Sequence, residues 1–347
     1  MKNLSIIKSE RYSNFSKEKW DNIINQFYGS VFYSYSYVEY LKLCNKKNLI
    51  ENCSFIIFKN NEPMTVVLLF VEEQGSKKQI SIGNNTIQCP LYNPSLNKKD
   101  LKIISKYVIE KIHEIVSENR CDLARFQISS FNFLEDKKNY SNFYQDYGFK
   151  NKFSEKNWYL FKCDKALILD LAKKKDLIYQ NIRTSYKSLI NKTRQNTSLE
   201  ILDQNNLDEN LFEKYGIFHN HIKKNKRSSD NLKFNFNLIK EGKEIIFLCL
   251  SNDEIVGSMV VLSLNKKAYI NSICKIDDDI KVYPIHYLFW SSIEYFLNKK
   301  YKYFWIGEKT NKNIKNLSDI EKNLSFFKEG WGGEEVQWTQ IEKEFYE

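Results

Sequence analysis

The chain carries two copies of one pattern of apolar and polar positions, far apart in the sequence. Each copy has a short apolar strand, a polar turn and a second apolar strand, which together predict a β-hairpin. The strand, turn and strand are Ser54–Phe58, Lys59–Glu62 and Met64–Glu72 in the first copy, and Ile245–Leu250, Ser251–Glu254 and Ile255–Leu264 in the second. A pattern repeated in this way indicates two halves of like topology.

After each hairpin, apolar residues recur at helical spacing, and a strand and an aromatic element with glycine follow. These three segments are Asp100–Asn119, Leu123–Ser129 and Phe143–Phe149 in the first copy, and Pro284–Leu297, Tyr303–Ile306 and Phe326–Gly333 in the second. Asp100 and Pro284 suit the starts of their helices, because an acidic side chain can cap free N–H groups and proline lacks one. The order of elements predicts an α+β fold with two domains, residues 1–164 and 165–347.

Between the two copies lies a segment with no counterpart in the first half. Asn157–Asp164 is predicted as a strand that ends the first domain. Leu167–Arg194 and Leu207–Lys224 are predicted as helices, and both are rich in basic residues. The second domain is therefore expected to open with two basic helices.

Composition narrows the class of protein. Of the 347 residues, 42% are hydrophobic and 15% are aromatic, which is typical of globular and not of disordered chains. The longest apolar stretches, Met64–Val71 and Ile255–Leu264, are too short to span a bilayer, and the N-terminus lacks the apolar region of a signal peptide. A cytoplasmic protein without a transmembrane segment is expected.

The cysteines and histidines do not form a ligand pattern. The seven cysteines are scattered and contain no C-x-x-C pair, which favours reduced thiols over a disulfide framework or a zinc site. His219 and His221 are two positions apart in a predicted helix and so lie on different faces, and His113 looks like an ordinary helix residue. No metal site is predicted.

Lysine and arginine outnumber aspartate and glutamate by 53 to 43, which gives a formal net charge of +10. The excess indicates either attraction to a polyanion or the Lys- and Asn-rich usage of an AT-rich genome. Much of it lies in two clusters, Lys173–Arg194 and Lys223–Arg227, which favours binding of nucleic acid, a nucleotide-linked substrate or an anionic membrane surface. A solvated helix face remains the alternative interpretation.

Several segments resemble the Fem-type branch of the GNAT acyltransferase superfamily. Ile182–Lys192 is similar to the helix that opens the second domain of Fem-type proteins, although Thr184 occupies a position that tends to be basic there. The other similar segments are Phe212–Arg227, Asp253–Gly257, Trp305-Ile-Gly307, the ending Phe327-Lys328-x-x-Trp331-Gly332-Gly333 and, near the N-terminus, Phe32-x-Ser34-x-x-Tyr37. The resemblance covers nearly the whole chain.

The resemblance implies two GNAT-like domains in tandem. It also implies transfer of an amino acid or acyl group to an amine of a peptidoglycan precursor or another envelope building block. Well-known Fem-type members take the amino acid from aminoacyl-tRNA, and some carry a long helical arm, for which this sequence has no room. The implied acceptor is a nucleotide- or lipid-linked precursor, which is compatible with peripheral association with a membrane.

The sequence also bears on the donor. GNAT enzymes that use acyl-CoA hold its pyrophosphate with main-chain N–H groups of a Q/R-x-x-G-x-G/A loop before a helix. In the equivalent segment Lys281–His286, Pro284 offers no N–H and His286 crowds the phosphate, and Cys89–Pro94 in the first half is no better. No cofactor is therefore predicted, and aminoacyl-tRNA, which needs a basic surface instead, is favoured as donor.

Three functions stay open at this point. The favoured one is an N-acyltransferase that moves an amino acid from aminoacyl-tRNA to an amine of an envelope precursor. The second is acyl-CoA-dependent N-acylation of an amino sugar or amino acid in surface polysaccharide synthesis. The third is a non-catalytic protein that binds RNA or glycans.

Aminolysis of an activated ester needs a positioned amine, a proton acceptor and stabilisation of the oxyanion. Lys328, beside the glycine-rich turn, is the candidate contact for the oxyanion or a substrate phosphate, with a surface lysine as the alternative. Glu308, just past the Tyr303–Ile306 strand, is the candidate proton acceptor, with a turn cap as the alternative. Tyr269 and Asn271 are expected to line the cleft from one face of a strand, with core packing of Tyr269 as the alternative.

The candidate acceptor site combines residues from both domains. Arg183 and Lys187 are four positions apart on one helix face, with Tyr186 adjoining, and this group suits a diphosphate or carboxylate. The resemblance adds Tyr37 and Lys42 in the first domain.

Overall fold

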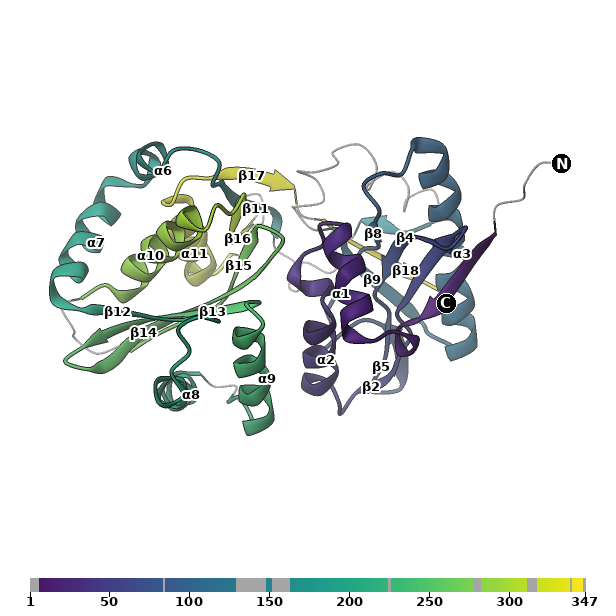
Figure 1. Ribbon diagram of the computed structural model, residues 1–347, viewed down its shortest axis with the longest axis horizontal. Helices are drawn as coiled ribbons and strands as arrows, with labels where there is room; N and C mark the ends of the chain where they lie inside the picture. Colours follow the sequence, from purple (N-terminus) through teal and green to yellow (C-terminus); the bar gives the residue numbers. More distant parts are fainter. Residues whose placement is uncertain are drawn as a thin grey trace. The chain divides into compact units, whose positions relative to one another are not determined.

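The computed structural model describes residues 6–83, 85–128, 148–151, 163–223, 226–276, 282–310, 317–337 and 339–345. The chain divides into two compact units (Figure 1). The first unit comprises Met1–Asp164 together with Gln337–Glu347, and the second comprises Lys165–Val336.

The first unit is built from two sheets and three long helices among its described residues. The helices are α1 (Lys17–Gln26), α2 (Tyr35–Cys44) and α3 (Lys98–Asn119). The strands are β1 (Ile7–Arg11), β2 (Leu49–Asn52), β3 (Phe55–Lys59), β4 (Glu62–Val67), β5 (Phe70–Gln74), β6 (Lys77–Ile80), β7 (Ile87–Gln88), β8 (Leu91–Tyr92), β9 (Leu123–Ile128), β10 (Lys150–Asn151) and β18 (Thr339–Glu344). One sheet has the order β1-β3-β4-β8, and the other has the order β10-β18-β9-β6-β5-β2, with β7 also beside β9.

The first predicted hairpin is present but shorter than expected. Asn60 and Asn61 have φ values of +53° and +68°, which a two-residue turn of this hand requires and asparagine tolerates. The predicted strand Met64–Glu72 is wrong as one element, because it divides into β4 and β5, which belong to different sheets. At the division, the Leu69 main chain accepts from the Cys53 N–H at 2.8 Å and donates to Ser54 Oγ at 2.9 Å.

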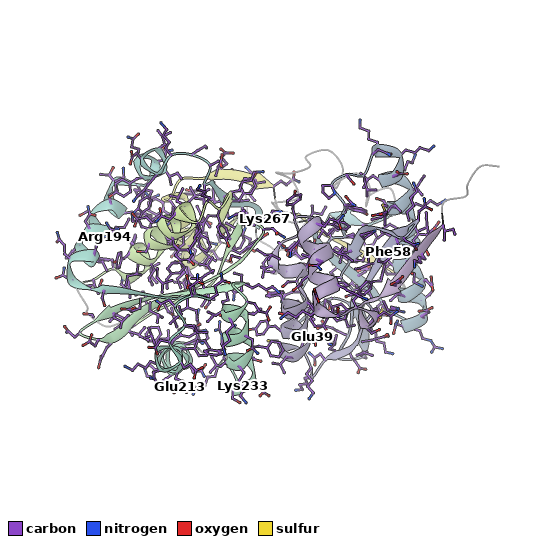
Figure 2. All side chains as sticks on the ribbon, in the orientation of Figure 1. Glu39, Phe58, Arg194, Glu213, Lys233 and Lys267 are labelled. Carbon is purple, nitrogen blue, oxygen red and sulfur yellow. The ribbon has the colours of Figure 1, made fainter. Side chains whose placement is uncertain are left out.

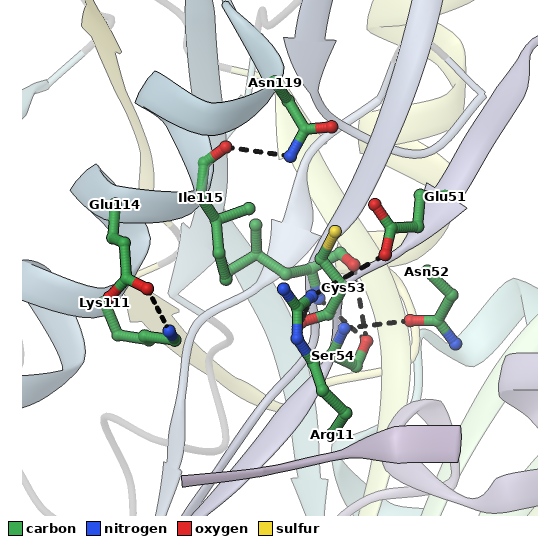
Figure 3. A network of polar contacts seen from close by, with 10 residues as sticks. Arg11, Glu51, Asn52, Cys53, Ser54, Lys111, Glu114, Ile115 and Asn119 are labelled. Atoms are coloured by element: carbon green, nitrogen blue, oxygen red, sulfur yellow. Dashed lines mark hydrogen bonds and ion pairs between the residues drawn. The ribbon is translucent and has the colours of Figure 1, made fainter.

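The connection that leads into β3 is held by short-range polar contacts (Figure 3). The Ser54 N–H donates to Asn52 Oδ1 at 3.0 Å, and Arg11 Nη1 donates to the Cys53 carbonyl at 3.5 Å. Arg11 also lies 3.9 Å from Glu51 Oε1. These contacts satisfy main-chain groups where the chain passes from β2 to β3.

The predicted helix Asp100–Asn119 is confirmed as α3, but Asp100 does not cap it. Asn97 is the N-cap, and its Oδ1 accepts from the Asp100 N–H at 2.9 Å. Asp100 lies in the first turn and pairs with Lys59 at 2.6 Å, and this hydrogen bond lowers the pKa of the Asp100 carboxyl. Asparagine is as good a cap as aspartate, so the sequence alone does not choose between them.

The second unit has one sheet covered on both faces. The strands are β11 (Cys163–Asp170), β12 (Ser198–Leu202), β13 (Glu244–Ser251), β14 (Glu254–Leu264), β15 (Lys267–Lys275), β16 (Tyr303–Thr310) and β17 (Glu334–Gln337), in the order β12-β13-β14-β15-β16-β11-β17. The helices are α6 (Lys175–Asn181), α7 (Thr184–Asn196), α8 (Glu209–Ile222), α9 (Ser229–Lys240), α10 (Pro284–Asn298) and α11 (Asp319–Glu329). Figure 1 shows α8 and α9 on one face and the other four helices on the opposite face.

Alternation along β13 explains the two layers. Ile245 and Phe247 pack with α7 and α10 in one core, whereas Ile246 and Leu248 pack with α8 and α9 in another. Because both faces are covered, the strand reads as a continuous apolar run.

The predicted helix Leu167–Arg194 is wrong at both its start and its middle. Ala166–Leu169 are buried in β11, which lies between β16 and β17, and the chain then forms α6 and α7 with Ile182 and Arg183 between them. A short apolar run fits a doubly covered strand as well as a buried helix, so periodicity alone cannot separate the two.

The predicted range of the second domain, 165–347, is wrong at its end. After β17 the chain returns to the first unit, where β18 pairs antiparallel with β9 and with β10. The predicted element Phe143–Phe149 and the strand Asn157–Asp164 fall largely outside the described residues.

Both units share one arrangement of two parallel strands joined by a helix. In the first unit β7 leads through α3 to β9, and in the second β15 leads through α10 to β16. The helices α6 to α9 that separate the two arrangements have only 7, 13, 14 and 12 residues, so the described chain holds no long helical arm. Among the residues that the structure describes, no helix is both long and apolar enough to cross a membrane.

A buried polar cluster lies between α8, α9 and the sheet of the second unit. Glu244 is 0% exposed, and its Oε2 accepts from Asn235 Nδ2 at 2.9 Å. Burial raises the pKa of the Glu244 carboxyl to about 7, although Arg227 opposes this shift. His219 is buried nearby, and burial together with Arg227 lowers the pKa of its imidazole to about 4.

Candidate functional site

The site begins where the parallel strands β15 and β16 separate. Their pairing runs from Lys267 opposite Tyr303 to Tyr269 opposite Trp305 and then ends. Both strands continue beyond this point, β15 to Lys275 and β16 to Thr310. The gap between two diverging strands of one sheet can hold a ligand, because it lies beyond the region where the strands bond to each other.

A pocket of about 830 Å³ occupies this gap, entirely within the second unit. Its wall is mainly apolar and aromatic, and it includes Val256, Ile273, Phe289, Trp305, Leu324 and Phe327. Its charged lining residues are Lys223, Lys275, Glu308 and Lys328. An apolar cavity with a few convergent polar groups is the usual form of a small-ligand site.

Lys328 and Glu308 meet at this pocket. Lys328 is on the last turn of α11, and its Nζ donates to the Glu308 main-chain carbonyl at 2.6 Å. Glu308 lies within β16, and burial raises the pKa of its carboxyl while the Lys328 charge opposes the shift. A cation and a carboxyl with a raised pKa are thus side by side in an apolar cavity, a common sign of a functional site.

Gly307 allows Lys328 to reach this position. Its φ is +144°, and a Cβ on it would lie 2.8 Å from Lys328 Cε and 2.9 Å from Lys328 Nζ. The glycine of the Trp305-Ile-Gly307 segment therefore serves both the backbone conformation and the passage of the lysine side chain.

A β-bulge separates Tyr269 from Asn271. Val261 is opposite Ile270 and Val260 is opposite Ser272, so Asn271 is the extra residue in β15. Asn271 is exposed and lines the pocket, whereas Tyr269 is 4% exposed and packs against the Trp305 ring. The expectation that both residues line one cleft is wrong, because strict alternation does not continue through a bulge.

Three main-chain N–H groups at the start of α10, those of Tyr283, His286 and Tyr287, have partners within the protein. The Tyr283 N–H donates to Thr193 Oγ1 at 2.8 Å, and the N–H groups of His286 and Tyr287 donate to the Tyr283 carbonyl at 3.1 and 3.4 Å. Pro284 has no N–H. It packs against Gly257, where an added Cβ would lie only 2.6 Å from the Pro284 Cβ. This helix start is therefore poorly suited to hold a pyrophosphate.

Solved structures with the same architecture are known. A tandem GNAT protein from the clavulanic acid biosynthesis pathway matches with a TM-score of 0.52, 9% identity and coverage of 98% of both chains. L-PGS from Bacillus licheniformis matches with a TM-score of 0.54, 14% identity and coverage of 82% of both chains. FemX matches with a TM-score of 0.72, 11% identity and coverage of 97% of both chains.

The chain has the tandem GNAT fold of FemX. The predicted Fem-type architecture is therefore confirmed. No protein-family model and no curated protein matches the sequence. The similarity is one of fold, at sequence identities of only 9 to 14% in these three structures.

Within this FemX-like fold, the basic cluster Lys173–Arg194 is largely engaged by the protein itself. Lys173 pairs with Glu334 at 2.8 Å, and Lys175 and Arg194 both pair with Glu294, at 2.7 and 2.9 Å (Figure 2 labels Arg194). Less free positive charge remains there than the sequence indicates. Of the lysines that line the pocket, Lys223 belongs to the predicted basic cluster Lys223–Arg227, whereas Lys275, at the end of β15, was not predicted.

The predicted acceptor group lies beside α11 and does not line the pocket. Tyr186 is 6% exposed, and its ring contacts His286 and Trp331 in the core. Arg183 is the residue just before α7, and Lys187 Nζ donates to the Gln180 carbonyl at 3.0 Å. Arg183 contacts Tyr186 but lies before the helix, so it does not share a helix face with Lys187, which bonds to α6 instead.

Tyr37 and Lys42 are on α2 in the first unit. The Tyr37 ring contacts Phe32 at 5.3 Å, and Lys42 Nζ donates to Glu39 Oε1 at 2.8 Å. Tyr37 thus contacts a ring in the short helix before α2, whereas Lys42 pairs with a residue of α2 itself.

Proposed function

We propose that this protein is an N-acyltransferase that moves an amino acid from aminoacyl-tRNA to an amine of a peptidoglycan or other envelope precursor. The observation that carries this proposal is the meeting of Lys328 and Glu308 in the pocket between diverging strands. The fold shared with FemX supports an acyl-transfer reaction, because the resemblance to Fem-type proteins implies such a reaction and Lys328 was selected from that resemblance.

The proposed reaction is direct aminolysis. The amine nitrogen of the acceptor attacks the ester carbonyl carbon of the aminoacyl group, and a C–N bond forms as the C=O becomes an oxyanion. The intermediate then collapses, the ester C–O bond breaks, and the amide and a free ribose hydroxyl are released. The proton lost by the amine nitrogen ends on the ribose oxygen, so no external acid, base or oxidant is consumed.

Each residue has a defined part in this scheme. The Lys328 ammonium stabilises the oxyanion, and the apolar walls around it strengthen the interaction by excluding water. The Glu308 carboxylate accepts the amine proton and returns it to the leaving oxygen. Its raised pKa suits this role, because a base is most effective when its pKa is close to the working pH.

The donor is proposed from two features of the same pocket. At the start of α10 the N–H groups of Tyr283, His286 and Tyr287 are bonded within the protein and Pro284 has none, which disfavours a CoA pyrophosphate. Lys223 and Lys275 can contact phosphates of an RNA end, and Trp305 offers a ring on which a base can stack. Lys187, Tyr37 and Lys42 remain proposed contacts of the acceptor, and we propose a cytoplasmic location at which envelope precursors are built.

A coupled assay tests the donor. A synthetase charges tRNA with a labelled amino acid, and transfer to an amine acceptor is followed with and without ribonuclease. Ribonuclease is expected to abolish transfer. Transfer that survives ribonuclease and depends on acyl-CoA would instead support N-acylation of an amino sugar or amino acid. Steeply salt-dependent RNA binding without turnover of any donor would support a binding protein.

Gly307→Ala tests the path of Lys328. The substitution strains the backbone at φ +144°, at a cost of about 1–3 kcal/mol of unfolding free energy, and its Cβ displaces the lysine. Turnover is expected to fall at least tenfold. Gly75→Ala is the control, because Gly75 has φ +64° and no atom within 4 Å of an added Cβ. It should show a similar strain cost and normal turnover, and equal turnover in both variants would refute the proposed path.

A further inference from the structure

The last turn of α11, which carries Lys328, is held by a clasp from the start of α7. The Arg183 N–H donates to the Gly330 carbonyl at 2.8 Å, and Arg183 Nη2 donates to the Phe326 carbonyl at 3.1 Å. Tyr186 Oη donates to the Phe327 carbonyl at 3.2 Å. The Phe326 and Phe327 carbonyls also accept from the Gly330 N–H, at 3.3 and 3.2 Å, so the clasp adds a second donor to each of them at the end of the helix.

The clasp is closed by contacts between its own members. Arg183 Nη1 donates to Tyr186 Oη at 3.0 Å, so the hydroxyl that donates to α11 is itself held by the guanidinium. The guanidinium carbon lies 3.6 Å from the centroid of the Phe326 ring. A Cβ on Gly330 would lie 2.4 Å from Tyr186 Cε2, so glycine is needed for the tyrosine ring to lie against this turn.

In the clasp, the Arg183 guanidinium is bound to groups of the protein itself. Both terminal nitrogens of its guanidinium already donate to protein oxygens, and its planar face is stacked on Phe326. A cation at a helix C-terminus is also stabilised by the helix dipole. The charge that the sequence offered for a substrate phosphate is thus used within the protein, on a carbonyl two residues before Lys328.

We propose that Arg183, with Tyr186, is a positioning residue that fixes the turn bearing Lys328. The inference rests on the proposed function, in which Lys328 stabilises the oxyanion. Lys328 lies between the residues whose carbonyls the clasp holds, because Phe326 and Phe327 precede it and Gly330 follows it. Release of these carbonyls allows the turn to shift, and the ammonium then leaves the point 2.6 Å from the Glu308 carbonyl.

The expected effect is on the chemical step and not on substrate affinity. A displacement of about 1 Å of a catalytic group can reduce a rate roughly 100-fold. Arg183→Ala is expected to lower kcat about tenfold with an unchanged KM for the acceptor. Arg183→Lys should recover part of the loss, since one ammonium can reach one carbonyl but cannot form the planar fork. Tyr186→Phe keeps the ring and loses only the hydroxyl bonds, so its kcat should fall severalfold.

The test combines a mutant cycle with chemical labelling of Lys328. In the cycle, Arg183→Ala is expected to reduce kcat in the natural protein and to have no further effect in Lys328→Ala. Additive losses, or an increase in the acceptor KM, would overturn the positioning role. Millimolar guanidinium should restore kcat of Arg183→Ala, and failure to do so would count against the clasp. Lys322→Ala is the control, because this α11 lysine is exposed and pairs with Asp319 at 3.2 Å.

Labelling separates this inference from the proposed function. The rate at which an amine-reactive ester acylates Lys328 is measured by mass spectrometry in the natural protein and in Arg183→Ala. A several-fold faster reaction in the variant is expected, because the ammonium is no longer held at Glu308. An unchanged labelling rate would overturn the clasp even if Lys328 is catalytic. Normal turnover of Lys328→Ala would remove the catalytic role while leaving the labelling result interpretable.

Discussion

Replacing Lys328 with alanine is expected to lower turnover on the order of 100-fold while the protein stays folded. Lys328 is the cation whose Nζ is held at the Glu308 carbonyl inside the pocket. Loss of one preorganised group that contacts an oxyanion typically costs about 100- to 1000-fold in kcat, because water cannot substitute for it in an apolar cavity. Steady-state kinetics with saturating donor and acceptor measure the effect.

The same helix supplies the comparison for this variant. Lys322→Ala removes a cation from the exposed start of α11 and is expected to keep normal turnover. Thermal unfolding of both variants shows whether either is simply unfolded. A Lys328→Ala protein that retains more than one tenth of the normal kcat would end the assignment of this lysine.

The second large effect concerns stability and comes from Glu244. In the unfolded chain this carboxyl loses its proton near pH 4.5, whereas in the folded protein it keeps the proton until about pH 7. Between these values the folded state binds more protons, so the contribution to stability is full below pH 4.5 and is lost as the pH rises through 7. The difference corresponds to roughly 3 kcal/mol.

Glu244→Gln removes this loss and keeps an oxygen for Asn235. The difference in unfolding free energy between the variant and the natural protein is therefore expected to be about 2–3 kcal/mol larger at pH 8 than at pH 5, in favour of the variant. Urea denaturation at both pH values measures the gain, and comparison with the natural protein cancels the opposite trend of His219, whose stability contribution falls below pH 6.5. Glu254→Gln, at an exposed position on β14, should show no such pH dependence. A gain that is equal at both pH values would contradict the buried-acid account.

Local patterns predicted much of the second unit. The hairpin with its Asn252–Asp253 turn has the positive φ values that these residue types favour, +51° and +64°. Pro284 begins α10 as expected, because proline suits a first helical turn. These features depend on residues that are neighbours in the sequence, so the sequence contains the information.

Features that depend on distant partners were missed. The apolar run at the start of Leu167–Arg194 became β11 because β16 and β17 flank it, and β18 joined the first unit because β9 and β10 accept it. The bulge at Asn271 likewise depends on the pairing of β14 with β15. No periodicity within a segment reveals which strand it will pair with.

The candidate site likewise has some features that the sequence predicts and others that only the fold shows. Lys328 and Glu308 come from separate elements; the resemblance pointed to Lys328 and acid–base chemistry pointed to Glu308, and the fold brings them together. Arg183 was selected for its charge, but its use as a clasp on α11 could be seen only once Phe326 was placed beside it. Charge alone shows that a residue can bind an anion or a carbonyl, and the fold determines which one it meets.

The central claim is that the pocket of the second unit holds an aminoacylated RNA end and does not hold CoA. A short RNA hairpin that ends in a non-hydrolysable 3′-aminoacyl amide can be titrated into the protein at two salt concentrations, with CoA as competitor. The account predicts binding that weakens steeply with salt, that weakens further in Lys223→Ala, and that CoA does not displace. Tight binding of CoA that displaces the RNA and survives the loss of Lys223 would contradict it.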